Sequence, residues 1–429
     1  MRYWLVLFGL ILGCASVSMA QGQPSSNLLK TEAMVAADNS QAAKAGAQML
    51  AMGGDAVDAA VATAFALGVV HPFASGIGGG GFAVIHRASG EQLALDFREV
   101  APKAATTTMF LDSKGNVMPD LSRLGALAVA VPGEVAGLYE LHRRYGKLPW
   151  ATVIQPAIKL ARDGFVISKI MHYKMNTALY HLRTSVLGPY LVQSGEKTRD
   201  AGMNMRLPPL ARTLERIAKY GAKDFYTGAI AKDIVGAMRR GGGLITLEDL
   251  ASYTVKTRPV LKATVLGHEI LTMPPPSSGG LVLIQVLKVL SGFDLKALGH
   301  NSAPYLHHLV ESFKHAFADR ARSMGDPDFV PLNHQRFISD KAVRRIRKAF
   351  DLNQTKPSAQ YGTKVHSGSD GGTSHLSALD AFGNAVALTT TVNTGFGSRF
   401  VAGKTGIVLN NQMDDFVARP GVPNSFGLD

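Results

Sequence analysis

Cysteine, tryptophan and charged residues are scarce in this sequence, and their scarcity excludes several classes of protein. The 429 residues include a single cysteine, so the chain cannot form an internal disulfide and is not a disulfide scaffold. Charged residues make up only 18% of the chain and hydrophobic residues 46%, a balance that excludes intrinsic disorder. The length allows two or three domain-sized units, or one large domain with a large hydrophobic core.

The N-terminus has the features of an export signal. A cationic start at Met1-Arg2 precedes the apolar run 3–12 and a small-residue cleavage site at residues 18–20, which predicts a signal peptide over residues 1–20. The apolar run is shorter than the ~20 residues that a membrane-spanning helix needs. We therefore expect an exported protein, periplasmic or secreted. A lipoprotein is the alternative, in which lipidated Cys14 would attach the chain to a membrane.

The formal net charge is +13, and a dense group of basic residues lies in the predicted helix 335–350. Its charged residues are Arg336, Lys341, Arg344, Arg345, Arg347, Lys348 and Asp340. Aromatic residues do not interleave with them beyond two phenylalanines, and no nucleic-acid-binding module is recognisable. We interpret this segment as a solvated helix face and predict no nucleic-acid partner.

The first part of the mature chain predicts two helices and then a β-hairpin. Residues 41–70 favour two helices, of which the second carries apolar residues on every face and is expected to be buried on all sides. The run Gly76–Gly81 matches the dinucleotide-binding spacing GxGxxG, but that motif needs a strand before it and a helix after it, and here the order is reversed. Residues 82–86 and 92–98 predict a hairpin that places Arg98 near a strand end.

The middle of the chain, residues 103–370, is predicted to be mostly helical with proline-rich breaks. The predicted helices are residues 133–145, 150–163, 207–220, 281–290, 304–322 and 335–350. Buried helices that alternate with hairpins indicate an α+β fold, without selecting one arrangement within that class.

A second hairpin follows a loop rich in glycine, serine and aspartate at residues 359–372. Residues 374–380 and 385–393 predict its two strands, joined by a turn at residues 381–384. With the turn centred there, Thr373 lies opposite Thr391 to within about one residue, and opposed Cβ atoms are ~5 Å apart. Two threonines are therefore expected to meet where the loop joins the hairpin.

Several familiar catalytic motifs are absent. The sequence contains no HExxH, CxxC or carboxylate-rich metal loop and no GxSxG elbow, so we predict no metal and no cofactor. Ser194–Lys197 matches SxxK and Lys404–Gly406 matches KTG, as in β-lactamases. No SDN lies between them, and Gly195 disfavours a helix at the serine, so we reject that interpretation.

Thr373, in the segment 370–375, is the remaining candidate nucleophile. If the Gly372–Thr373 peptide bond is cut, the free α-amino group of Thr373 can act as the base for its own Oγ. One residue would then carry both nucleophile and base. An isolated Gly-Gly-Thr is more often an ordinary turn before a strand, so its sequence context decides.

That context resembles the γ-glutamyltranspeptidases. The similar small-subunit motifs are 373–375, 383–387, 389–394 and 409–416, and the large-subunit ones are 53–60, 71–82, 96–99, 131–133, 273–280 and 311–320. The family consists of N-terminal-nucleophile hydrolases. The resemblance therefore implies a four-layer αββα sandwich and a proenzyme cleaved at Gly372-Thr373, with 21–372 as the large-subunit region and 373–429 as the start of the small-subunit region.

The resemblance also implies the reaction. Thr373 Oγ would attack the γ-carbonyl of glutathione or another γ-glutamyl compound and form a γ-glutamyl ester. Water, or an amino-acid or peptide acceptor, would then resolve the ester. The two pieces of the cut chain would remain partners.

Five further residues would build the site by resemblance. Thr391 would orient Thr373, and Arg98 would clamp the substrate α-carboxylate, a role that suits its planar fork. Asn393, Gln412 and Asp415 would hold the α-ammonium group. The ordinary alternative for Arg98 is a surface ion pair with the neighbouring Glu99 or Asp96.

The chain departs from the family pattern at its C-terminus. A Ser-Ser pair that would help to bind the carboxylate and a Gly-Gly pair that would form the oxyanion hole are missing after residue 416. Ser277–Gly280 matches a different family motif and cannot replace them. We therefore expect the sandwich to be incomplete at the C-terminus, and a catalytically inactive remnant that at most binds γ-glutamyl ligands is the alternative function.

Overall fold

The computed structural model describes residues 33–429 except 119, 195–196, 363–371, 423 and 426–429. The predicted signal peptide, Cys14 and most of the predicted loop 359–372 lie outside these residues. The described part of that loop begins in a short 3-10 helix, Ser358–Tyr361, which starts one residue before it.

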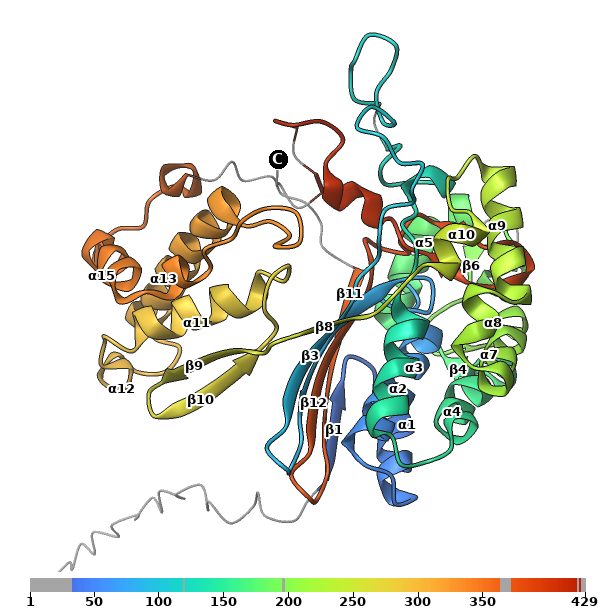
Figure 1. Ribbon diagram of the computed structural model, residues 1–429, viewed down its shortest axis with the longest axis horizontal. Coiled ribbons are helices and arrows are strands. Elements are labelled where there is room, and N and C mark those ends of the chain that lie inside the picture. Colours follow the sequence, from blue (N-terminus) through green and yellow to red (C-terminus); the bar gives the residue numbers. More distant parts are fainter. Residues whose placement is uncertain (1–32, 119, 195–196, 363–371, 423, 426–429) are drawn as a thin grey trace, which may run out of the picture. The chain divides into compact units, whose positions relative to one another are not determined.

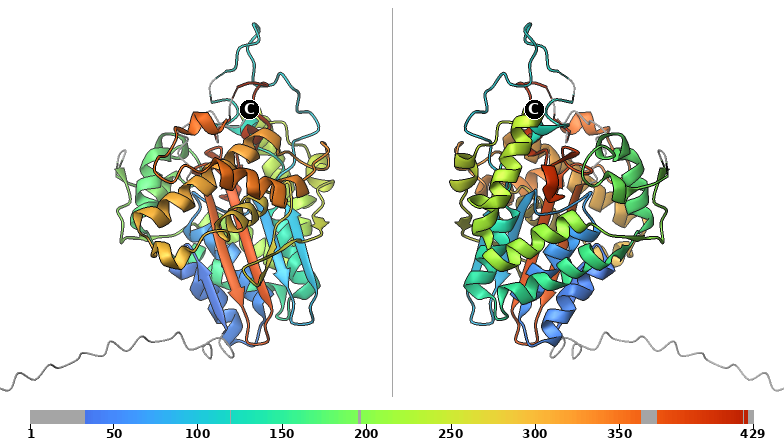
Figure 2. Two further views of the ribbon diagram at one scale, coloured as in Figure 1. Left: turned by 90° about the vertical axis from the view of Figure 1, so that its left-hand side faces the viewer. Right: turned by 90° about the vertical axis from the view of Figure 1, so that its right-hand side faces the viewer.

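A six-stranded antiparallel sheet is the centre of the fold, with strand order β1-β11-β12-β2-β3-β8. Its strands are β1 Met34–Ala37, β2 Gly80–His86, β3 Gln92–Phe97, β8 Lys256–Arg258, β11 Gly372–Leu379 and β12 Ala385–Asn393. Both predicted hairpins are therefore confirmed. In Figure 2 the orange β11–β12 hairpin runs between blue strands from the N-terminal part of the chain.

Helices cover one face of this sheet, and the sequence explains the innermost helix. Helix α2, Ala56–Val70, is buried at every position, as its apolar composition predicts. Asp55 caps its N-terminus and forms a reciprocal capping box with Asp58, which satisfies backbone N–H groups that a helix start leaves without partners. Helix α1, Ser40–Ala51, packs beside α2, and α2 contacts β11 and β12 (Figure 1).

The remaining helices of this layer include three at predicted positions, residues 133–145, 150–163 and 207–220, and others that were not predicted. They are α3 Glu134–Tyr145, α4 Trp150–Asp163, α5 Lys169–Leu182, α6 Gly188–Leu191, α7 Pro208–Tyr220, α8 Ala222–Tyr226, α9 Ala229–Gly241 and α10 Leu247–Ala251. Three short strand pairs accompany the helices or the C-terminal segment: β4 Phe165–Val166 with β7 Asn204–Met205, β5 Val192–Ser194 with β6 Lys197–Thr198, and β13 Phe400–Val401 with β14 Val408–Leu409.

A hairpin that the sequence analysis missed precedes a second group of helices. Strands β9 Leu261–Val265 and β10 His268–Thr272 pair around a turn at Leu266 and Gly267, both with positive φ. The helices are α11 Gly279–Leu290, α12 Leu295–Leu298, α13 Ala303–Ser323, α14 Gln335–Ile338 and α15 Asp340–Ala349.

The prediction of a single helix over residues 335–350 is wrong, because two helices, α14 and α15, occupy this segment. Ser339 adopts an extended conformation between α14 and α15, and its hydroxyl accepts a hydrogen bond from the N–H of Ala342. The side chain thus caps a new helix. The prediction that the basic residues of this segment form a solvated helix face is also partly wrong. Arg345 pairs with Asp319 at 2.6 Å, and Arg347 donates to the Val289 carbonyl at 2.9 Å.

The predicted α+β class is confirmed, and the two predicted subunit regions share one sheet. Strand β11 pairs with β1 on one side, and β12 pairs with β2 on the other, so residues after 372 lie between strands from before it. One hydrophobic core includes Phe65 of α2, Leu388 of β12 and Leu409 of β14. Residues 373–429 are therefore not a separate domain.

Candidate functional site

The two threonines predicted to meet do so at the start of strand β11. Thr373 lies directly opposite Thr391 in the register, and their Oγ1 atoms are 3.0 Å apart. Thr373 is exposed, whereas Thr391 is buried. The sheet therefore holds one accessible hydroxyl against one inaccessible hydroxyl.

The hydrogen bonds of Thr391 determine the direction of that contact. Its hydroxyl donates to the Gly372 carbonyl oxygen at 2.8 Å and accepts from the N–H of Asn393 at 2.8 Å. A hydroxyl has one proton to donate. Because that proton goes to Gly372, the hydroxyl of Thr373 donates to Thr391. The carbonyl that precedes Thr373 is thus polarised by the same hydroxyl that orients the Thr373 side chain.

Gly372 has no room for a side chain. A Cβ at this position would lie 2.1 Å from the carbonyl oxygen of Asn393, which is backbone and cannot move aside cheaply. Asn393 itself has φ 80°, a left-handed conformation that asparagine tolerates better than most residues. The backbones at the ends of the two strands therefore pack closely around the Gly372–Thr373 bond.

Arg98, Gln412 and Asp415 come together as a second group. Arg98 lies just beyond β3, and its Nη2 contacts Asp415 Oδ2 at 2.9 Å. The side-chain amide of Gln412 donates to the same carboxylate oxygen from within the 3-10 helix Gln412–Phe416. The protein around Asp415 raises the pKa of its carboxyl by desolvation, and Arg98 opposes that rise. The group joins one cation to one anion.

Asn393 links the two groups. Its side-chain amide donates to the carbonyl of Asn411 at 3.0 Å, and its backbone N–H reaches Thr391. Asn411 directly precedes Gln412 in the chain. The strand that holds Thr391 and the segment that holds Asp415 are therefore connected by direct hydrogen bonds.

Two buried carboxyl groups, Glu99 beside Arg98 and Glu134, were not predicted as site residues. Glu99 has a fully buried side chain whose oxygens have no hydrogen-bond partner among the described residues, and Arg98 Nε is 3.7 Å away. Burial raises the pKa of Glu99 to about 7, although Arg98 lowers it. Glu134, at the start of α3, is also buried, and burial raises its pKa well above the usual range. From the sequence, Glu99 was predicted only as an alternative ion-pair partner of Arg98. Its burial could not be predicted, because it depends on tertiary packing.

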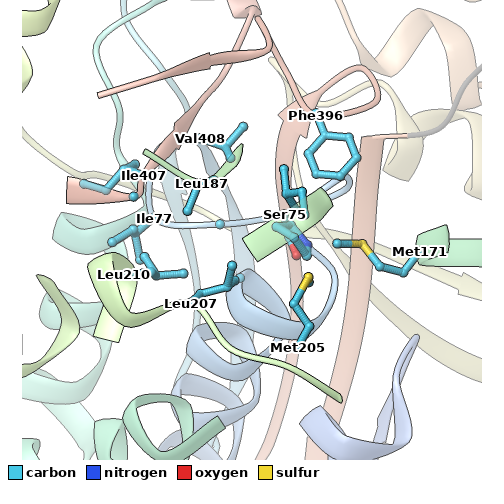
Figure 3. Close-up of a pocket in the computed structure, with 15 residues that line it drawn as sticks. Ser75, Ile77, Met171, Leu187, Met205, Leu207, Leu210, Phe396, Ile407 and Val408 are labelled. Carbon is cyan, nitrogen blue, oxygen red and sulfur yellow. The ribbon is translucent and has the colours of Figure 1, made fainter. Parts of the chain in front are cut away.

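Two cavities in the described part of the chain do not coincide with these residues. An apolar cavity of about 20 Å³ is lined by Met171, Met205, Phe396 and Ser75. Figure 3 shows these lining residues. That volume holds about one water molecule. A larger cavity of about 860 Å³ lies between α13 and α15. Thr373, Thr391 and Arg98 line neither of them.

The rejected motifs do not assemble another centre. Ser194 ends β5 and Lys197 begins β6, so no helix starts at the serine of SxxK. Among the residues that the structure describes, no three His, Cys, Asp or Glu side chains gather as metal ligands. None of the described helices combines the length and apolar character needed to cross a bilayer.

Comparison with known proteins identifies the family. Residues 42–429 match the family model described as Gamma-glutamyltranspeptidase. The chain is 42% identical over 400 residues to the glutathione hydrolase proenzyme of Escherichia coli, covering 92% of this chain and 69% of that protein. It is 45% identical over 402 residues to the glutathione hydrolase proenzyme of Pseudomonas aeruginosa, covering 92% and 70% respectively.

Solved structures agree with this assignment. The crystal structure of Helicobacter pylori γ-glutamyltranspeptidase superimposes with a TM-score of 0.72 at 43% sequence identity, covering 78% of this chain and 97% of that one. The predicted N-terminal-nucleophile hydrolase fold is thereby confirmed. The chain belongs to the γ-glutamyltranspeptidase family.

Proposed function

We propose that this chain is a γ-glutamyl hydrolase and transferase that acts on glutathione and related γ-glutamyl compounds, with Thr373 as its nucleophile. The observation that carries the proposal is the 3.0 Å contact of Thr373 with Thr391 beside the Gly372 carbonyl. Membership of the family supports the reaction type, since the curated relatives are named glutathione hydrolases.

The first step of the proposal is self-cleavage. Thr373 Oγ attacks the carbonyl carbon of Gly372, the Gly372–Thr373 C–N bond breaks, and the acyl group moves to Oγ as the amide nitrogen takes up a proton. Water then hydrolyses the ester and leaves Thr373 with a free α-amino group. The hydrogen bond from Thr391 to the Gly372 oxygen lies where negative charge develops, which favours this attack.

The free amino group then serves the catalytic cycle. It accepts the proton of Thr373 Oγ as the oxygen attacks the substrate γ-carbonyl, and the leaving amine takes up a proton as the amide bond breaks. A γ-glutamyl ester of Thr373 results. Water releases glutamate, or an amino-acid or peptide amine accepts the γ-glutamyl group. Every step uses groups of the chain, substrate and water, without a cofactor.

The Arg98–Asp415 ion pair supports the proposed site for the glutamyl α-carbon. A substrate with one carboxylate and one ammonium group can replace the pair, its carboxylate on Arg98 and its ammonium on Asp415. Gln412 already donates to Asp415, and Asn393 connects this segment to Thr391. Each charge therefore keeps an opposite partner when substrate binds.

Export completes the proposal. The predicted signal peptide at residues 1–20 would direct the protein to the periplasm or outside the cell, and a membrane attachment would require lipidation of Cys14. The alternative of an inactive remnant is not favoured, because both the threonine pair and the Arg98–Asp415 pair are formed and the relatives are enzymes.

The test combines gel electrophoresis with hydrolysis of a γ-glutamyl anilide. We expect the purified chain to separate into two pieces with a new N-terminus at Thr373, and Thr373→Ala to remain uncut and inactive. Thr177→Ala, on the exposed side of α5, controls for loss of a threonine hydroxyl. An uncut wild-type chain without anilide hydrolysis would contradict the proposal.

A further inference from the structure

Arg320 is a half-buried cation near the end of α13, and its Nε donates to the hydroxyl of Ser278 at 2.7 Å. Its guanidinium carbon lies 5.7 Å from the ring centroid of Phe317. Among the described residues, no carboxylate forms an ion pair with it, although neighbouring Arg322 on the same helix pairs with Asp319. A half-buried arginine without a carboxylate is costly unless a ligand supplies one.

The end of α13 is tied to the strand edge that carries Arg98. Arg258 of β8 contacts Asp328, eight residues after Arg320, at 2.8 Å and Asp96 of β3 at the same distance. Asp96 in turn accepts the backbone N–H of Arg98. These contacts bring the chain that follows Arg320 to the glutamyl site.

Arg320 also acts electrostatically on the proposed site. Burial lowers the pKa of the Arg320 guanidinium and the Asp415 carboxylate opposes that effect, while Arg320 is one of the groups that lower the pKa of Asp415. The two side chains are therefore near enough to influence each other's ionisation. Arg98, which contacts Asp415 directly, and Arg320 both lower the pKa of the Asp415 carboxyl.

Glutathione carries two carboxylates and one ammonium group, whereas the proposed glutamyl site supplies one cation, Arg98, and one anion, Asp415. Its γ-glutamyl part carries one ammonium and one carboxylate, which match Asp415 and Arg98. Its C-terminal glycine carries a second carboxylate, two residues from the bond that is broken. Two extended residues span at most about 7 Å, so the group that recognises this carboxylate must lie close to the glutamyl site.

We propose that Arg320, positioned by Ser278, binds the C-terminal carboxylate of the leaving group in a γ-glutamyl peptide and of the peptide acceptor. The inference rests on the proposed function and extends it to substrate choice. The Ser278 hydroxyl accepts the hydrogen bond from Nε–H, which leaves the terminal nitrogens of the guanidinium for a forked contact with a carboxylate. The ring of Phe317 supports the guanidinium. The site then prefers γ-glutamyl peptides over γ-glutamyl amides.

The experiment compares two donors that differ in this carboxylate. Hydrolysis of glutathione and of γ-glutamyl-p-nitroanilide, which lacks the carboxylate, is measured for wild type, Arg320→Gln, Arg320→Lys and Ser278→Ala. Loss of a charge-assisted hydrogen bond lowers affinity roughly 10- to 100-fold. We expect Arg320→Gln to raise the KM for glutathione by that factor and to leave the KM for the anilide within about twofold. The KM of Arg320→Lys for glutathione should lie between those of wild type and Arg320→Gln.

A binding measurement separates this inference from the proposed function. Calorimetry of glutathione and of its C-terminal amide with the Thr373→Ala chain, with and without Arg320→Gln, does not depend on turnover. Arg322→Gln, two residues along the same helix, is the matched control. A wild-type chain that binds glutathione without hydrolysing it contradicts only the proposed function. An equal decrease in affinity for glutathione and its amide, or an equal effect of Arg322→Gln, would overturn the role of Arg320.

Discussion

Replacing Thr391 by alanine removes one hydroxyl that serves three neighbouring groups. The hydroxyl donates to the Gly372 carbonyl at 2.8 Å, accepts from the Asn393 N–H at 2.8 Å, and lies 3.0 Å from Thr373 Oγ1. In Thr391→Ala none of the three groups has this partner. We expect self-cleavage to slow sharply and the fold to become less stable.

The magnitudes follow from the hydrogen bonds that the substitution removes. A donor to the oxygen where charge develops is worth roughly 2.7 to 4 kcal/mol, so cleavage should slow by about 10²- to 10³-fold. A buried group left without its hydrogen bond costs about 1 to 3 kcal/mol. With the Asn393 N–H and the Gly372 carbonyl both affected, the free energy of unfolding should fall by about 2 to 6 kcal/mol.

The assay is a time course of cleavage on denaturing gels, with thermal unfolding of the uncut chain in parallel. Thr391→Ser retains the hydroxyl and should cleave within about tenfold of wild type. Thr389→Ala is the matched control, because it removes a hydroxyl two residues earlier on the same strand, where the partner is His375. If Thr391→Ala is cut as fast as Thr389→Ala, our account of the Gly372 carbonyl is refuted.

Two further predictions concern stability. Alanine usually stabilises a helix by about 1 kcal/mol relative to glycine, but a Cβ at Gly137 would lie 2.2 Å from the ring of Phe97. Gly137→Ala should therefore destabilise by about 1 to 3 kcal/mol, whereas Gly236→Ala, whose nearest neighbour is the flexible end of Arg240 at 3.5 Å, should stabilise in the same denaturation assay. Glu99 has a folded-state pKa of about 7 against an ordinary value of 4.5, so the folded state binds more protons between these values and its stability falls as pH rises through them. Glu99→Gln should remove up to about 3 kcal/mol of that pH dependence, and an unchanged slope of unfolding free energy between pH 4.5 and 7 would show that Glu99 does not titrate there.

The local elements were predictable because neighbouring residues specify them. The apolar run after Asp55 could only become a buried helix, and the turn at residues 381–384 set the register that places Thr373 opposite Thr391. The break at Ser339 was predictable in principle, since serine followed by aspartate is a helix-start signal. We did not predict the break because basic residues occur on both sides of Ser339, and they were interpreted as one continuous helix.

Contacts between segments that are distant in the chain could not be predicted from local sequence patterns. Asp415 lies 317 residues from Arg98 along the chain, and the resemblance to a family placed the two residues in one site without predicting that they pair. The burial of Glu99 and the hydrogen bond from Arg320 to Ser278 likewise depend on which segments surround them. Such contacts result from the packing of the whole chain.

The sequence by itself determined the α+β class, the family and the facing pair of threonines, since each depends on residues that are neighbours in a motif, a helix or a hairpin. Only the tertiary structure decided that β11 pairs with β1, that the Thr391 hydroxyl donates a hydrogen bond to the Gly372 carbonyl, and that Arg98 pairs with Asp415. Those outcomes require two backbones or two charges to be placed within about 3 Å of each other. These distances are set by the packing of the sheet and helices, so they cannot be predicted from any single segment of the sequence.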